Sequence, residues 1–166
     1  IKTIFNILGP LTNPASAKCQ LVGVSDKKLT TVFVKVLQKL GSEHVVAVHG
    51  EDGMDEISIT GKTFIAELKN NKITEYIIDP SLFGLKKGSL KDIIVQDSEH
   101  SKNIILDILD GNHSVARDIA VLNAGAAIYV SGLTKDMGAG ILMAKEKIDD
   151  GHALNKLNQL IEASNA

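Results

Sequence analysis

The fold is decided by residues 20–48, which read QLVGVSDKKLTTVFVKVLQKLGSEHVVAV. Short apolar runs rich in valine stand near both ends, over residues 21–24 and 45–48, and each is typical of a buried strand. Between them, apolar residues recur at three- and four-residue steps over residues 29–40, which predicts an amphipathic helix. A strand, a helix and a strand in this order predict a parallel pair joined by a right-handed crossover.

The flanking residues support this helix. Ser25 or Asp26 can cap its start, because a short polar side chain accepts a hydrogen bond from the first free backbone N–H groups. Gly41 suits its end, where a left-handed backbone is common. The block over residues 20–48 is therefore predicted to be an α/β unit, and ligands of such units gather beyond the carboxyl ends of the strands.

The rest of the chain adds a hairpin and helices. Strand-like segments over residues 63–68 and 73–78 flank Asn70-Asn71, a pair that tolerates the positive φ angles of a tight turn. From residue 98 onward the pattern is helical, with helices expected before Gly111, before Gly132, before Gly151 and from Ala153 onward. The expected fold is α/β, with a mainly parallel sheet that carries an antiparallel hairpin and is flanked by helices.

Composition narrows the classes of function. The 166 residues are 44% hydrophobic, which suffices for one domain with a sizeable core. Lys and Arg number 18 against 20 Asp and Glu, so the net charge of -2 provides no general attraction for nucleic acid or an anionic membrane. The single Cys19 cannot form an internal disulfide and is expected to be a buried apolar residue. A cytoplasmic protein that binds small molecules, with no membrane partner, fits these observations.

An acidic loop follows the second predicted strand. Residues 49–56 read HGEDGMDE and carry four carboxylates within residues 51–56. Magnesium prefers oxygen ligands and often binds one or two carboxylates together with substrate phosphates, so Asp55 and Glu56 are candidate Mg²⁺ ligands. The same pattern fits a loop whose charges simply face water, and the residues alone leave both interpretations open. The spacing excludes the twelve-residue calcium loop.

A loop rich in proline precedes the first predicted strand. Residues 6–14 read NILGPLTNP, with a Gly-Pro and an Asn-Pro pair around an apolar residue and a hydroxyl. Rigid loops of this kind shape pockets, but prolines also stop helices in plain connectors, and both interpretations remain open here. The loop offers no reactive side chain.

Other catalytic patterns are weak. The five histidines show no metal-ligand spacing, and the sequence lacks the His-Glu-x-x-His and Gly-x-Ser-x-Gly motifs. Gly138-Ala139-Gly140 lacks both a third glycine and a preceding strand, so it is not a dinucleotide-binding loop. Nucleophilic catalysis by a side chain has no support.

Three segments, taken together and in order, carry a family resemblance. They are residues 3–14 (TIFNILGPLTNP), residues 49–58 (HGEDGMDEIS), and residues 117–130 with Arg117-Asp118, Leu122-Asn123-Ala124 and Tyr129-Val130. In this combination the chain resembles the anthranilate phosphoribosyltransferases over nearly its whole length. The two loops are the specific parts, whereas the Ala-rich stretch is a generic core pattern.

The resemblance implies the C-terminal half of a two-domain enzyme. Residues 1–16 would be a connector with the substrate loop, and residues 17–166 would be the C-terminal portion of an incomplete large α/β catalytic domain. The implied substrates are phosphoribosyl pyrophosphate (PRPP) and anthranilate, and the implied cofactor is Mg²⁺. The implied protein partners are the missing N-terminal half and, at full length, a second copy in a homodimer.

The family's functional residues carry over in part. Asp55 and Glu56 match the acidic pair that holds magnesium on the pyrophosphate, Gly9 and Pro10 match the loop that lines the anthranilate path, and Asn13 is a further substrate-binding candidate. No side chain is assigned a catalytic role, because charge stabilisation and positioning dominate the implied departure of pyrophosphate from an oxocarbenium-like ribose.

The resemblance also marks what this chain lacks. The family's glycine-rich pyrophosphate loop, a Lys-His-Gly-Asn segment and an arginine for the anthranilate carboxylate all lie upstream of Ile1, so the chain is expected to be inactive alone. Lys2 stands where family members often carry arginine, which keeps the charge but loses the bidentate geometry of a guanidinium.

Two other functions were weighed. A pyrimidine-nucleoside phosphorylase shares the implied architecture but uses orthophosphate, and the Asp55-Glu56 pair argues against it. A non-enzymatic relative that binds nucleic acid should show a basic stripe and a high pI, whereas the pI here is about 6.2.

Overall fold

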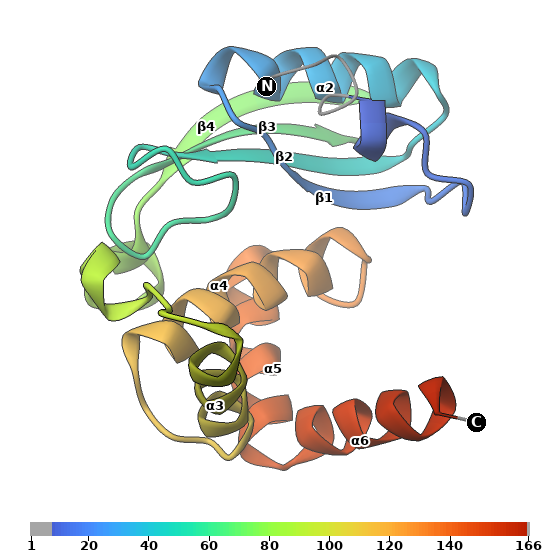
Figure 1. The fold of residues 1–166 in the computed structure, drawn as a ribbon. Coiled ribbons are helices and arrows are strands. Elements are labelled where there is room, and N and C mark those ends of the chain that lie inside the picture. The colour runs from blue at the N-terminus through green and yellow to red at the C-terminus, as the bar shows by residue number, and fades with distance from the viewer. Residues whose placement is uncertain (1–7, 166) are drawn as a thin grey trace.

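The computed structural model describes residues 8–165 as a four-stranded sheet with helices on both sides (Figure 1). The strands, in their order across the sheet, are β1 (Cys19–Gly23), β2 (His44–Gly50), β3 (Thr63–Lys69) and β4 (Lys72–Ile78). One face carries α2 (Lys27–Lys39), and the other side carries α3 (Ser98–Leu109), α4 (Val115–Val130), α5 (Met137–Asp149) and α6 (His152–Ser164). Three short 3-10 turns are η1 (Gly9–Leu11), η2 (Pro80–Phe83) and η3 (Leu90–Asp92). The expectations that concern residues 1–7, Lys2 included, lie outside the described residues.

The predicted unit over residues 20–48 is confirmed. β1 and β2 pair in parallel, and α2 connects them. Asp26, rather than Ser25, caps the helix, since its carboxylate accepts a hydrogen bond from Lys28 N at 2.8 Å. Gly41 follows the helix with a φ of 89°, the left-handed conformation that favours glycine.

The hairpin is also confirmed, but the sheet is mixed rather than mainly parallel. β3 and β4 pair antiparallel around Asn70 and Asn71, whose φ angles are 51° and 60°. Within residues 8–165, β1 with β2 is the one parallel pairing, and β2 with β3 is antiparallel. The reason lies in residues 51–62, which join β2 to β3 without a helix, whereas a parallel return usually crosses over through a helix.

The core has two parts, one on each face of the sheet. Val45 and Ala47 of β2 point to the side of α2, where they pack with Phe33 and other buried apolar residues. Val46 and Val48 point to the opposite side, against α4 and α5. Successive strand residues face opposite sides, so a strand covered on both faces reads as one continuous apolar run.

The helical layer depends on small residues, which lie where α4 and α5 meet. α4 and α5 approach so closely that a Cβ atom added to Gly140 would collide with the carbonyl oxygen of Gly125. The contact brings the two helices together beneath the sheet and buries Leu122 and Ile141 between them. The pair therefore forms a rigid support for the side of the sheet that faces it.

The outer edge of β1 differs from the rest of the sheet. No strand within residues 8–165 pairs with this edge. Cys19, the first residue of β1, is exposed, so the expectation that it is buried was wrong. Its position at the start of an edge strand leaves it without covering residues. Within the same described range, no helix is both long and apolar enough to cross a membrane.

Candidate functional site

The acidic loop leaves the carboxyl end of β2, where the sequence predicted a ligand site, and Asp52 holds it together. The Asp52 carboxylate accepts hydrogen bonds from Ser58 Oγ and Thr60 Oγ1, both at 2.6 Å, and from Met54 N at 3.1 Å. Burial opposes ionisation of Asp52, but these hydrogen bonds outweigh it and lower its pKa. Asp52 is therefore a structural anchor of the loop.

Asp55 and Glu56 form the other half of this acidic loop, and their situation is different. Both are exposed, and neither carboxylate has a hydrogen-bond or ion-pair partner among residues 8–165. Partial burial and the negative charges of Asp55 and Asp52 raise the pKa of Glu56. A divalent cation would relieve this crowding of like charges.

The donor set fits magnesium held jointly with a substrate. No group of three or more His, Cys, Asp or Glu side chains in the described range could hold a metal ion by itself. Two neighbouring carboxylates supply only part of an octahedral shell, and Mg²⁺ commonly completes it with water and phosphate oxygens. Asp55 and Glu56 are the residues that could contribute.

The backbone of the loop is placed directly against the end of β1. A Cβ atom at Gly23 would overlap the carbonyl oxygen of Asp55, so only glycine fits there. Nearby, His49 Nδ1 donates a hydrogen bond to the carbonyl oxygen of Val24 at 2.8 Å. The carboxyl ends of both parallel strands therefore hold the loop.

Helix α4 contributes a residue that the sequence did not predict to belong to the site. Asn123 Oδ1 accepts a hydrogen bond from Ile57 N at 2.9 Å, and Asn123 Nδ2 donates one to Ile57 O at 2.9 Å. From its sequence, this part of α4 was interpreted as generic core. The available signal was a lone amide in an otherwise apolar stretch, which needs a hydrogen-bond partner when it is enclosed.

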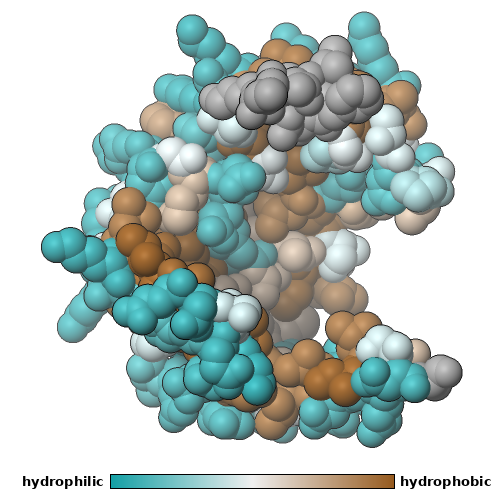
Figure 2. All heavy atoms as spheres, in the orientation of Figure 1, coloured by the Kyte–Doolittle hydropathy of each residue, from teal (hydrophilic) through white to brown (hydrophobic). Residues whose placement is uncertain are grey.

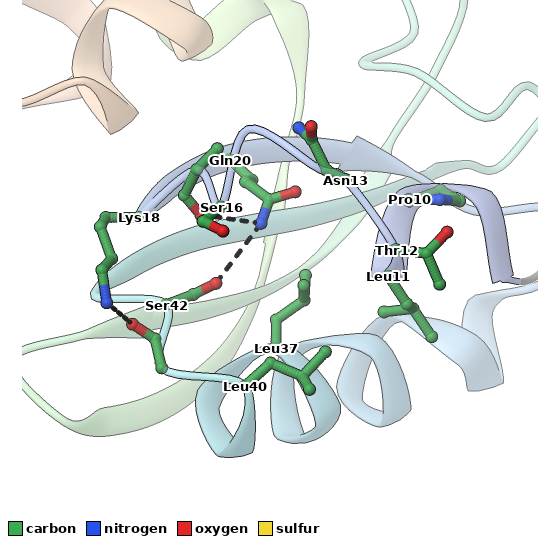
Figure 3. Close-up of a pocket in the computed structure, with 12 residues that line it drawn as sticks. Pro10, Leu11, Thr12, Asn13, Ser16, Lys18, Gln20, Leu37, Leu40 and Ser42 are labelled. Carbon is green, nitrogen blue, oxygen red and sulfur yellow. Dashed lines mark hydrogen bonds between the residues drawn. The ribbon is translucent and has the colours of Figure 1, made fainter.

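The proline-rich loop lies at the other end of the unit. Pro10 and Asn13 help to line a cavity of about 290 Å³ beside the end of α2 and the start of β1 (Figure 3). Asn13 Oδ1 accepts a hydrogen bond from Ala15 N at 3.0 Å, so its side chain helps to shape the loop. The remaining lining residues are Leu11, Thr12, Ser16, Ala17, Lys18, Gln20, Leu37, Leu40, Gly41 and Ser42.

The structure does not bring the two predicted sets of site residues together. Gly9 and Pro10 belong to η1, and Asn13 precedes the start of β1, whereas Asp55 and Glu56 follow the end of β2. Because β1 and β2 are parallel, these positions are at opposite ends of the strands. Within residues 8–165 each set stands alone, and the roles given to Gly9, Pro10 and Asn13 stay predictions.

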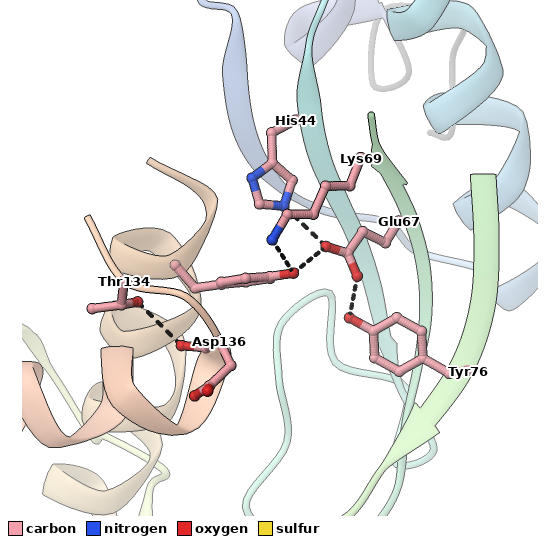
Figure 4. A network of polar contacts seen from close by, with 7 residues as sticks. His44, Glu67, Lys69, Tyr76, Thr134 and Asp136 are labelled. Atoms are coloured by element: carbon pink, nitrogen blue, oxygen red, sulfur yellow. Dashed lines mark hydrogen bonds and ion pairs between the residues drawn. The ribbon is translucent and has the colours of Figure 1, made fainter. Parts of the chain in front are cut away.

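A second carboxylate, Glu67, lies between the sheet and α4 (Figure 4). It accepts hydrogen bonds from Tyr129 Oη at 2.6 Å, from Tyr76 Oη at 2.8 Å and from His44 Nε2 at 2.9 Å. Burial opposes its ionisation, but these three donors outweigh burial and lower its pKa. Lys69 Nζ also donates to Tyr129 Oη, at 3.0 Å. The cluster joins β2, β3, β4 and α4, so it is a structural tie between the layers.

Comparison with known proteins adds an independent line of evidence. Residues 1–154 match the glycosyl transferase family, a/b domain. The chain is similar to an anthranilate phosphoribosyltransferase of Methylobacillus flagellatus, with 48% identity over all of this chain and 49% of that protein. It is also similar to one of Laribacter hongkongensis, with 50% identity over 98% of this chain and 47% of that protein.

Solved structures agree. The crystal structure of anthranilate phosphoribosyltransferase from Thermus thermophilus matches with a TM-score of 0.91 and 30% identity, over all of this chain and 49% of that one. The enzyme from Saccharomyces cerevisiae in complex with PRPP and Mg matches with a TM-score of 0.84 and 29% identity, over 98% of this chain and 47% of that one. The chain thus spans about half the length of the relatives it matches.

Proposed function

The chain belongs to the glycosyl transferase family, and from this premise we propose that it is part of an enzyme that transfers the phosphoribosyl group of PRPP to anthranilate, a step of tryptophan biosynthesis. The observation that carries the proposal is the exposed pair Asp55 and Glu56, without a side-chain partner within residues 8–165, on a loop at the carboxyl end of β2. Relatives named anthranilate phosphoribosyltransferase match almost the whole chain with about half of the residues identical.

The carboxylates of the acidic loop would have different roles. Asp55 and Glu56 would hold Mg²⁺, which when bound supplies charge neutralisation for the diphosphate of PRPP. Asp52 would keep the loop in shape through its hydrogen bonds to Ser58 and Thr60. No nucleophilic side chain is required, because the anthranilate amine is itself the nucleophile in the proposed reaction.

We assign the path of anthranilate to Gly9, Pro10 and Asn13 on the strength of the sequence match. Pro10 fixes the backbone of η1 and offers no proton or charge, so its contribution would be the shape of the wall. The distance of this loop from the acidic pair along the strands means that other parts of the enzyme must complete the path between them.

The other half of the enzyme is the proposed partner, and the surface offers it a place. Figure 2 shows a hollow between the sheet and α6, lined by apolar side chains. In α6, Leu160 is 64% exposed and Ile161 is 49% exposed, and the edge of β1 is unpaired within residues 8–165. An unpaired strand edge is a template for pairing with another strand, so further strands beside β1 would extend the sheet over this hollow, opposite α6.

Of two further assignments, the homodimer rests on the resemblance and the cytoplasmic location on the composition. At full length the enzyme would form a homodimer, and it would act in the cytoplasm. The exposed free thiol of Cys19 is compatible with a reducing compartment.

Co-expression of this chain with the other half tests the proposal. Formation of phosphoribosyl-anthranilate is followed by loss of anthranilate fluorescence, for the lone chain, the other half and the mixture. We expect turnover only in the mixture, because this chain carries the acidic pair but neither the pyrophosphate loop nor the arginine implied for anthranilate. Turnover by the lone chain would show that the other half is not required. Phosphorolysis of a pyrimidine nucleoside by the mixture without use of PRPP would overturn the proposed reaction.

A further inference from the structure

We propose that Asn123 is a positioning residue for the reaction: its side-chain amide fixes the backbone directly after Asp55 and Glu56 and so sets where the two carboxylates lie. The inference rests on the proposed function, since it concerns the same metal-binding pair. Asn123 lies on α4, and the residue it binds, Ile57, is 66 positions away in the sequence.

The two hydrogen bonds form a pair that no other side chain at this position would reproduce. Ile57 N donates to Asn123 Oδ1 and Ile57 O accepts from Asn123 Nδ2, each at 2.9 Å, in the manner of a neighbouring strand. A carboxamide is the shortest side chain that offers a donor and an acceptor side by side. Asn123 Nδ2 also donates to Ile119 O at 3.0 Å, which ties the amide to its own helix.

The acidic pair is thereby held on both sides. On one side, Met54 O accepts a hydrogen bond from Gly50 N at 2.8 Å, and Met54 N donates to Asp52 Oδ1. On the other side, Asn123 binds both polar backbone groups of Ile57. Asp55 and Glu56 are the only two residues between these anchors, so little freedom remains for their backbone.

Asn123 holds Ile57 in a fixed place because helix α4, which carries Asn123, is itself rigidly packed. The close packing of Gly125 against Gly140 fixes α4 on α5 near Asn123. Ile57 itself is only 1% exposed, so water cannot easily replace the amide as its partner. A buried backbone group that loses its partner is costly, and the segment would shift to find another. A shift there moves Glu56 directly.

The test uses the full-length enzyme and three variants. Asn123→Leu keeps the branched heavy-atom skeleton of the side chain and removes both hydrogen bonds, and Asn123→Gln keeps both groups but displaces them by one methylene. Tyr129→Phe is the matched control, because it removes a hydrogen bond from the same helix to the sheet, at Glu67, far from the acidic loop. Equilibrium binding of PRPP is measured against Mg²⁺ concentration, together with the thermal midpoint and the steady-state constants.

We expect both Asn123 variants to raise the Mg²⁺ concentration for half-maximal PRPP binding by about tenfold, the effect typical of residues that orient metal ligands. The KM for anthranilate should change much less than that for PRPP. Tyr129→Phe should lower the thermal midpoint and leave the Mg²⁺ dependence unchanged.

Failure of this inference and failure of the proposed function would give different results. If both Asn123 variants, or the Gln variant alone where the Leu variant does not fold, bind PRPP with the Mg²⁺ dependence of the wild type, the inference is wrong. Failure of the proposed function would instead appear in the wild type, as an absence of Mg²⁺-dependent PRPP binding.

Discussion

Two sets of carboxylates in this chain have opposite surroundings. Glu67 is 7% exposed and accepts hydrogen bonds from two tyrosines and a histidine, whereas Asp55 and Glu56 are exposed and have no partner within residues 8–165. The pKa shifts follow this contrast, since that of Glu67 is lowered and that of Glu56 is raised. A carboxylate whose lone pairs are already used by donors stabilises the fold, while a crowded and unpaired one is available for a cation.

The largest expected effect is on the structural carboxylate. Glu67→Ala should reduce the free energy of unfolding by about 3 kcal/mol, because Tyr76, Tyr129 and His44 lose their common acceptor inside the protein. Urea unfolding of the full-length enzyme measures this loss. Glu75→Ala on the adjacent strand, where the carboxylate is exposed, serves as control and should cost about 0.5 kcal/mol or less. Equal costs would contradict the structural role of Glu67.

The same residue predicts a dependence on pH. Because folding lowers the pKa of Glu67, the folded protein favours its ionised form. The contribution of Glu67 to stability is therefore complete above its unfolded pKa of about 4.3. The contribution is lost as the pH falls through the lower, folded pKa. Removal of the carboxylate in Glu67→Ala should therefore flatten part of the acid limb of the thermal midpoint against pH, and an unchanged acid limb would contradict this.

A smaller effect is expected from a change that moves the acidic loop without removing any carboxylate. Gly23→Ala places a Cβ atom where the carbonyl oxygen of Asp55 lies, so the acidic loop must move. We expect a stability loss of about 1–3 kcal/mol and a fall of about tenfold or more in kcat/KM for PRPP. Gly138→Ala is the control, since its Cβ would meet only Asp136 Oδ1, at 3.4 Å. Wild-type kinetics in Gly23→Ala would show that the position of Asp55 is unimportant.

How far the sequence predicts this molecule depends on the range of the interaction. The unit over residues 20–48 and the hairpin around Asn70-Asn71 follow from apolar periodicity and turn chemistry, both of which are local. The antiparallel return of β3 and the exposure of Cys19 depend on how the sheet is assembled, and neither was predicted from the sequence. Local patterns carry no information on which strand lies at an edge.

The candidate site divides in the same way. The acidic loop at the end of β2 was predicted, and so was the choice of Asp55 and Glu56 as candidate ligands. The anchoring role of Asp52 was not, because it follows from contacts with Ser58 and Thr60. Asn123 stands out in sequence as a lone amide in an apolar stretch, but its partner Ile57 is 66 positions away, and no local pattern identifies that partner.

The most direct test of the central claim, that the acidic pair is kept unpaired for a cation, concerns Glu56→Gln. Its matched control is Glu51→Gln, which removes an equal charge from the same loop. The measurement is the thermal midpoint of the full-length enzyme, with and without Mg²⁺ and PRPP together.

Without ligands, the thermal midpoint of Glu56→Gln should equal that of the wild type or lie slightly above it, by the equivalent of a few tenths of a kcal/mol in the free energy of unfolding. The reason is that the pKa of Glu56 is raised by folding, so ionised Glu56 opposes folding above its unfolded pKa. With Mg²⁺ and PRPP, the wild type and Glu51→Gln should gain several degrees from ligand binding, and Glu56→Gln should gain much less. An equal gain in all three proteins, or a clear loss of stability in ligand-free Glu56→Gln, would contradict the account.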